Sequence, residues 1–315
     1  MWHRFYKLLL MPMVLAAAAG VAWAAPPSVA VILPKTPPHL VTIHEAFLKR
    51  FAEISADQPA PRFYLQTPND DYMSLRNSAR KAVALNADLI LAFGTSAAMA
   101  AKAESFETPV LFADAIEPEA IGLVTNNKRD SQLATGVRGN APLQTLFKLL
   151  RDLTNAVKLA IILDGDLVDK QLTAIFKDAA GRRGFDLVPI TIQEKTPAAV
   201  MRAVADSKAE GLLFIEAEDR HQAIINLAME QKMPIVSIVP GMAERGALLV
   251  MEVSPEEQGV ALADMTLKVL NGDFPEAIQV VTPRKSGVVI NLISAQKCGV
   301  QVPFEVLSQA TRIIR

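Results

Sequence analysis

Four consecutive residues, Gly94-Thr95-Ser96-Ala97, have the types and the spacing of an anion-binding turn. They follow the apolar run 89–93 and open an alanine-rich stretch that is typical of a helix. The first N–H groups of a helix lack partners within it, and with the helix dipole they attract carboxylates and phosphates. We expect Thr95, Ser96 and Ala97 to hold the anionic end of a ligand. The alternative is that a hydroxyl here only caps its own helix.

Polar residues also end most of the other apolar runs. One of them alone is explained by helix capping or turn formation, but a shared sheet edge would gather them around a ligand. Arg138 could pair with a second acidic group of the ligand or with a neighbouring acid of the chain. The other expected ligand-binding residues are Asp114, Glu117, Asp164, Glu216 and Ser237.

Signatures of catalysis and of metal binding are missing from the sequence. It has no nucleotide-binding glycine motif, no Gly-x-Ser-x-Gly elbow and no His-Glu-x-x-His pair. The four histidines are not clustered as metal ligands, and no nucleophile can be matched with a base. We expect no enzymatic activity, no metal and no cofactor.

The residues above are positioned by short apolar runs that alternate with stretches of helical periodicity. This alternation predicts an α/β protein with parallel sheets covered on both faces. The expected strands are 28–33, 62–66, 88–93, 110–113, 135–138, 158–163, 186–192, 211–216, 234–239 and 248–253.

The alternation runs twice, which predicts two Rossmann-like lobes that enclose a cleft at the carboxyl ends of their strands. The late helix 255–272 is expected to return to the first lobe. The predicted division is 25–138 plus about 254–275 for the N-terminal lobe, and 139–253 plus about 276–315 for the C-terminal lobe.

The first 24 residues resemble a secretory signal peptide. Arg4 and Lys7 precede an apolar stretch, and Ala22-Trp23-Ala24 forms a small-x-small exit, so we expect cleavage before Ala25 and a periplasmic protein. An uncleaved membrane anchor is the alternative, although the stretch is short for a span of about 20 residues. Without Arg4 and Lys7, 30 of the 32 basic residues remain against 33 acidic ones, which gives no reason to expect binding to nucleic acid.

Six segments follow one another in a characteristic order: DLILAFGTSAAMAAKAESFETPVLFADAIEPEAIGLV, ATGVRG, LAIILDGD, GLLFIEAED, MPIVSIVPGMAERGALLV and SGVVINLISAQKCGVQVP. This ordered series resembles the periplasmic substrate-binding proteins of ABC transporters, in the type I family that includes tryptophan-binding members. The resemblance implies a type I fold of two lobes that close over a small ligand.

The resemblance also implies roles for individual positions. Gly94-Thr95-Ser96-Ala97 matches a Gly-Thr-x-Ala segment that holds a ligand carboxylate in the family. At other positions the chain departs from the family pattern: Glu117-Pro118 stands for Asp-Pro, Asp164-Gly165-Asp166 for an asparagine turn, Glu216 or Glu218 for an aspartate, and Ser254-Pro255 for Asp-Tyr.

The expected function is capture of a small molecule, an amino acid or another carboxylate, for delivery to an inner-membrane ABC permease. Two alternatives stay open at this stage. The chain could be a periplasmic sensing subunit that docks on a membrane kinase or cyclase, or an exported α/β enzyme.

Overall fold

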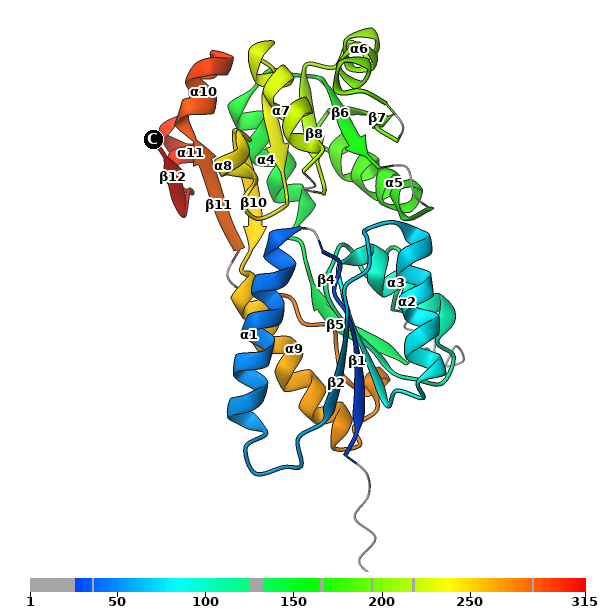
Figure 1. Ribbon diagram of the computed structural model, residues 1–315. Coiled ribbons are helices and arrows are strands. Elements are labelled where there is room, and N and C mark those ends of the chain that lie inside the picture. The colour runs from blue at the N-terminus through cyan, green and yellow to red at the C-terminus, as the bar shows by residue number, and fades with distance from the viewer. Residues whose placement is uncertain are drawn as a thin grey trace, which may run out of the picture.

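The computed structural model describes residues 26–35, 37–124, 133–164, 167–193, 195–216, 219–284 and 286–315. The expected signal peptide and three expected or alternative site positions, Gly165, Asp166 and Glu218, lie outside these ranges. The described chain forms two α/β lobes, one above the other in the view of Figure 1. The predicted fold class is confirmed.

The first lobe is built on a five-stranded parallel sheet in the order β2-β1-β3-β4-β5. Every residue of β3 is buried, as expected of a central strand covered on both faces. The strands are β1 (Ser28–Ile32), β2 (Arg62–Gln66), β3 (Leu89–Phe93), β4 (Val110–Ala115) and β5 (Ala134–Arg138).

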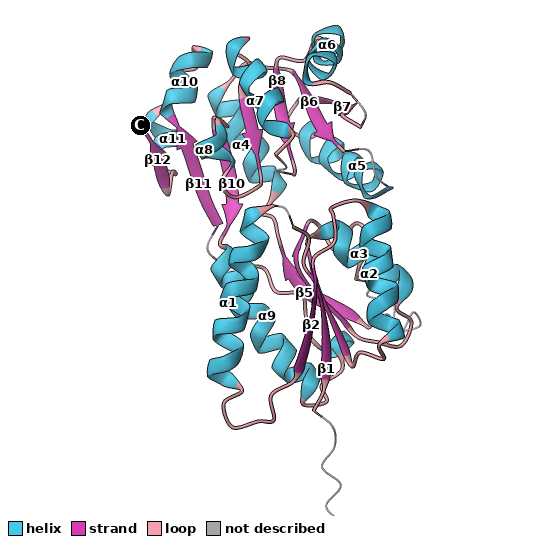
Figure 2. Cartoon of the chain, viewed as in Figure 1, coloured by secondary structure: helices cyan, strands magenta, loops and turns pink. Residues whose placement is uncertain are grey.

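Four helices cover this sheet, two on each face (Figure 2). α1 (Pro38–Ile54) and α9 (Pro255–Leu270) lie on one face, and α2 (Tyr72–Ala84) and α3 (Thr95–Glu104) on the other. The backbones of α1 and α9 approach closely at Gly259, where an added Cβ atom would lie 2.3 Å from the Ile43 carbonyl oxygen. The first lobe therefore uses a helix that the chain reaches only after the second sheet's first five strands.

The second lobe contains a seven-stranded sheet in the order β12-β11-β10-β9-β8-β6-β7. Its β10–β11 pair is antiparallel, an exception in a sheet whose other pairs are parallel. β10 runs out toward the first lobe and β11 returns from it, which requires opposite directions. The strands are β6 (Lys158–Leu163), β7 (Asp186–Thr191), β8 (Gly211–Phe214), β9 (Ile235–Ser237), β10 (Leu249–Val253), β11 (Ser286–Asn291) and β12 (Arg312–Ile314).

The helices of the second lobe form two contacting groups. In the first, α4 contacts both α5 and α11, and in the second, α7 contacts α6 and α10. The helices are α4 (Leu143–Leu153), α5 (Leu167–Gly181), α6 (Pro197–Ser207), α7 (His221–Glu230), α8 (Met242–Arg245), α10 (Leu292–Cys298) and α11 (Phe304–Leu307). Among the described residues, no helix has the length and apolar character that crossing a membrane requires.

The chain passes between the lobes after β5, after β10 and before β11. Following the 3-10 turn η1 (Pro275–Ala277), it still runs along β5: the Thr135 hydroxyl donates to the Ile278 carbonyl at 2.8 Å, and Val281 forms a bridge with Val137. We therefore propose that the boundary between the lobes lies after Val281 rather than near residue 276.

Candidate functional site

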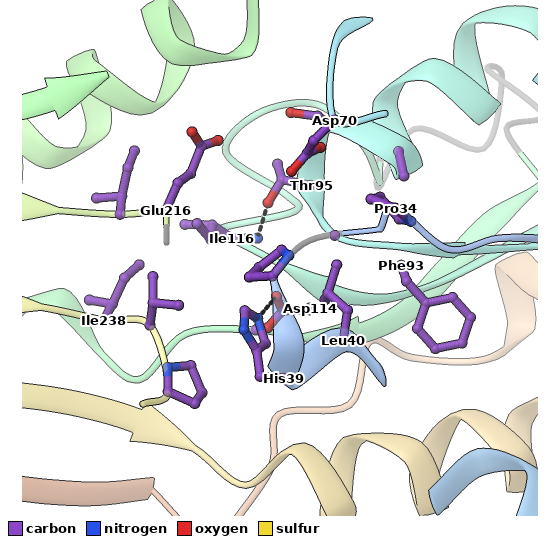
Figure 3. A pocket seen from close by; sticks show the side chains of 18 residues that line it. Pro34, His39, Leu40, Asp70, Phe93, Thr95, Asp114, Ile116, Glu216 and Ile238 are labelled. Carbon is purple, nitrogen blue, oxygen red and sulfur yellow. Dashed lines mark hydrogen bonds and ion pairs between the residues drawn. The ribbon is translucent and has the colours of Figure 1, made fainter. Parts of the chain in front are cut away.

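A cavity lies between the facing carboxyl edges of the two sheets, with about 620 Å³ of non-atom space that includes open solvent. Residues at or after the ends of β1, β2, β3, β4 and β5 line it from the first lobe, and residues after β8 and β9 line it from the second. Figure 3 shows Glu216 and Ile238 entering from the side opposite Pro34 and Phe93.

The start of α3 forms part of the cavity wall. Gly94 turns the chain with a φ of 91°, a conformation that favours glycine, and Thr95, Ser96 and Ala97 follow as the first residues of the helix. The Ile116 N–H donates to the Thr95 hydroxyl oxygen at 3.0 Å (Figure 3). No side-chain cap closes this helix start, so the Thr95 hydroxyl ties down a neighbouring loop rather than capping α3.

Asp114 lies at the end of β4 in a left-handed conformation with a φ of 60°. The register between β4 and β5 shifts between Phe112 and Ala115, and this irregularity surrounds Asp114. Its carboxylate meets His39 Nε2 at 2.8 Å and accepts from Gln258 Nε2 at 3.3 Å, while its N–H donates to Gln258 Oε1 at 2.9 Å. Two segments distant in sequence, at the starts of α1 and α9, therefore hold this carboxylate.

Gly139, after β5, leaves the space that Asp114 needs. A Cβ atom at this position would lie 2.6 Å from the Asp114 Cα and Oδ1 atoms. Real Cβ contacts are not that short, so only glycine fits beside the Asp114 side chain as it is placed.

Three carboxylates line the cavity, from Asp70, Asp114 and Glu216. Among the described residues that line it there is no lysine or arginine, and His39 is the one basic side chain. The remaining wall is mostly apolar. It includes Pro34, Pro37, Leu40, Phe93, Ile116, Ile215, Ile238, Val239 and Pro240.

The structure brings together five of the nine expected ligand-binding residues: Thr95, Ser96, Ala97, Asp114 and Glu216 all line the cavity. It does not bring Glu117 and Arg138 to the lining. Arg138 instead donates to Glu117 at 3.0 Å and to Glu119 at 2.5 Å, the neighbouring-acid alternative that its sequence position left open.

Asp164 and Ser237 also lie away from the cavity lining. Asp164 pairs with Arg220 at 2.6 Å and with His221 Nε2 at 3.2 Å. Ser237 is fully buried, and its hydroxyl donates to the Phe214 carbonyl and accepts from the Val239 N–H. Because that hydroxyl ties β9 to β8 inside the sheet, we do not include Ser237 in the proposed site.

Sequence reasoning missed His39, Asp70 and Gln258. His39 and Asp70 follow β1 and β2 respectively, so the rule that drew attention to Asp114 would have found them at the same sheet edge. Gln258 gave no such signal, because it lies in the first turn of α9 and reaches Asp114 across 144 positions of sequence.

No group of three or more histidine, cysteine or carboxylate side chains is arranged to hold a metal ion within the part of the chain that the structure describes. The site consists of a helix start, acidic groups and an apolar wall. Such a lining can bind and orient a small molecule through hydrogen bonds, charge and apolar contact.

Comparison with known proteins gives a family match over nearly all of the described chain. The family model described as ABC transporter substrate binding protein matches residues 28–314. A tyrosine-binding protein of Clostridioides difficile is 23% identical over 233 residues, which cover 72% of this chain and 67% of that protein.

Two solved structures have the same fold. The ABC domain in complex with L-Trp from Streptococcus pneumoniae has a TM-score of 0.80 at 22% identity, covering 92% of this chain and 100% of that one. A conserved domain protein from Vibrio cholerae gives the same TM-score, identity and coverage. At these identities the likeness shows the fold.

Proposed function

Because the chain belongs to the family of ABC transporter substrate binding proteins, we propose that it captures a small, carboxylate-bearing molecule between its lobes and delivers it to an inner-membrane ABC permease. The observation that carries the proposal is the cavity between the two sheet edges, lined from both lobes. A ligand held there contacts both lobes at once, so its binding favours their closed arrangement.

The start of α3 suits the carboxylate of the ligand. Thr95, Ser96 and Ala97 present the positive end of the helix dipole to the cavity, and a carboxylate can be held there without an opposing full charge. The Thr95 hydroxyl already accepts from Ile116, and its own proton is the one it can offer a ligand.

The acidic wall favours a ligand that also carries a positive charge. A purely anionic molecule would face Asp70, Asp114 and Glu216 with no lysine or arginine among the described lining residues. We therefore propose an amino acid as the ligand. The names of two relatives, the tyrosine-binding protein and the complex with L-Trp, support this class.

The same site suits a protein that binds its ligand outside the cytoplasm and catalyses no reaction on it. We propose that it works in the periplasm and releases its ligand chemically unchanged. Incubation with a bound amino acid, followed by mass spectrometry, should recover that amino acid intact; a product would favour the enzyme alternative.

Ligand binding tests the function directly. Purified protein is screened by thermal shift against the common L-amino acids, with benzoate and 4-hydroxybenzoate as carboxylates that lack an amine. A ligand present at a hundred times its dissociation constant adds about 2.7 kcal/mol to the free energy of unfolding. Stabilisation by no amino acid, or by the benzoates alone, would contradict the proposed ligand class.

The contribution of the α3 start is measured with Thr95→Ala combined with Ser96→Ala. Losing a charge-assisted hydrogen bond costs about 1.5 to 3 kcal/mol, so affinity for an amino acid identified in the screen should fall roughly ten- to a hundredfold by calorimetry. Thr95→Ser is the matched control, because it keeps the hydroxyl that accepts from Ile116. Unchanged affinity in the double variant would remove the anion-binding role from this turn.

A further inference from the structure

One ring nitrogen of His39 contacts Asp114, and the other has no hydrogen-bond partner among the residues that the structure describes. The residue is the second of α1 and only 8% exposed, and its Nε2 atom lies 2.8 Å from Asp114 Oδ2. That carboxylate also accepts from Gln258 Nε2. Since an ionised carboxylate can only accept, the proton of this contact resides on His39 Nε2.

The other nitrogen, Nδ1, is buried and has no hydrogen-bond partner among the described residues. Buried polar side-chain atoms of this kind are rare, because an unmade hydrogen bond in the protein interior is costly. His39 lines the cavity between the lobes, next to Pro37 and Leu40. A ligand held in the cavity would therefore lie beside the His39 ring.

We propose that His39 determines ligand specificity, with Nδ1 accepting a hydrogen bond from the ligand's ammonium group. The proposal rests on the proposed function. When an imidazole carries its one proton on Nε2, Nδ1 has a lone pair and can only accept. The adjacent wall is acidic, through Asp114, Asp70 and Glu216, so an N–H donor that carries positive charge fits best. Asp114 acts as a positioning residue that fixes the ring and its tautomer.

Two substitutions separate the roles of the two nitrogens. His39→Gln places an amide at the ε position, where it can still reach Asp114, and removes the acceptor at the δ position. His39→Asn places an amide oxygen at the δ position and gives up the Asp114 contact. We expect His39→Gln to weaken L-tryptophan or L-tyrosine binding roughly ten- to a hundredfold, and His39→Asn to weaken it less.

The analogues of these probes that lack the amine provide the second comparison. Indole-3-propionate and 3-(4-hydroxyphenyl)propionate keep the ring and the carboxylate, so His39→Gln should not change their affinities. The control variant is His44→Gln on the same helix: His44 is absent from the described cavity lining, and burial lowers its pKa. Circular dichroism and melting temperature establish that each variant is folded.

Each result decides the inference. Equal affinity of wild type and His39→Gln for the amino acid overturns it, and so does an equal loss for the analogue without the amine, since the ring would then serve only in packing. Long-range ¹H–¹⁵N spectra of the unliganded protein must show Nε2 protonated and Nδ1 bare; a ring protonated at Nδ1 also overturns it. If no common L-amino acid binds wild type, the proposed function has failed and the inference falls with it; if another amino acid binds in place of these two, the same comparison is made with it and its analogue without the amine.

Discussion

At the scale of single residues, the site depends on one strained aspartate. Asp114 adopts a φ of 60°, and His39, Gln258 and the bare backbone of Gly139 keep it there. Non-glycine residues adopt this left-handed region at a cost of about 1 to 3 kcal/mol, so the surrounding contacts must offset that cost. Strain of this kind, retained at the wall of a cavity, is consistent with a binding role for the side chain.

Gly139→Ala tests how far this arrangement matters. The added methyl group would lie 2.6 Å from Asp114, which must move, and its contacts with His39 and Gln258 would then be disturbed. We expect affinity for a cognate amino acid to fall at least about tenfold, with a loss of stability of about 1 to 3 kcal/mol. Calorimetry and urea unfolding measure the two effects.

Gly181→Ala is the control for this prediction, because a Cβ atom on Gly181 meets no atom within 4 Å. If Gly139→Ala bound the amino acid as tightly as this control, Asp114 would have no part in ligand binding.

At the scale of elements, the contact of α1 with α9 holds the first lobe's helical layer together. Ser254 caps α9 by accepting from the Glu257 N–H at 3.2 Å, and Pro255 begins the helix. Gly259 then allows the backbones to approach, since a Cβ atom would lie 2.3 Å from the Ile43 carbonyl and 2.7 Å from the Phe47 nitrogen. Backbone atoms cannot relieve such a contact by rotation about a side-chain bond, as side-chain atoms can.

Gly259→Ala should therefore destabilise the protein although alanine is the better helix former. Alanine gains up to about 1 kcal/mol in helix propensity, whereas overpacking against backbone costs about 1 to 3 kcal/mol or more. We expect a net loss of roughly 1 to 2 kcal/mol in urea unfolding. A stabilised variant would show that α1 and α9 can separate without penalty.

The elements were largely predictable from the sequence, and their long-range contacts were not. Continuous apolar runs predict buried parallel strands. Because the carboxyl ends of parallel strands meet at one edge of a sheet, Thr95, Asp114 and Glu216 are expected at the facing edges where they lie. The hydrophobic pattern of the sequence does not predict that Arg138 forms ion pairs with Glu117 and Glu119. Nor does it predict that the Ser237 hydroxyl on β9 donates to the Phe214 carbonyl on β8. Those contacts depend on distances between segments that local periodicity does not encode.

At the scale of the whole molecule, the lobes contact each other beyond the connecting segments, since α3 of the first lies against α5 of the second. The helix whose start is proposed to hold the ligand's carboxylate thus also lies at the contact between the lobes. Ligand capture and lobe closure would share this one helix.

The N-terminal segment, residues 1–24, predicts that the protein is exported. If residues 1–24 are a signal peptide, protein expressed from the full sequence should be recovered from the periplasm with Ala25 as its first residue, without a lipid adduct. Intact-mass spectrometry of the periplasmic fraction measures this, and replacing Ala22 and Ala24 with bulky residues should block processing. A mass that retains residues 1–24 would favour the membrane-anchor alternative.

The late position of α9 in the sequence constrains the order in which the protein can fold. The chain is synthesised from its N-terminus, so β1 to β5 and α1 are complete before residues 255–270 have been added. Until then, α9 does not yet cover Ile43 and Phe47 on α1. The adjacent face of β4 and β5 is also uncovered. A partly synthesised first lobe therefore exposes apolar surface until most of the polypeptide has been made, and exposed surface of this kind favours aggregation.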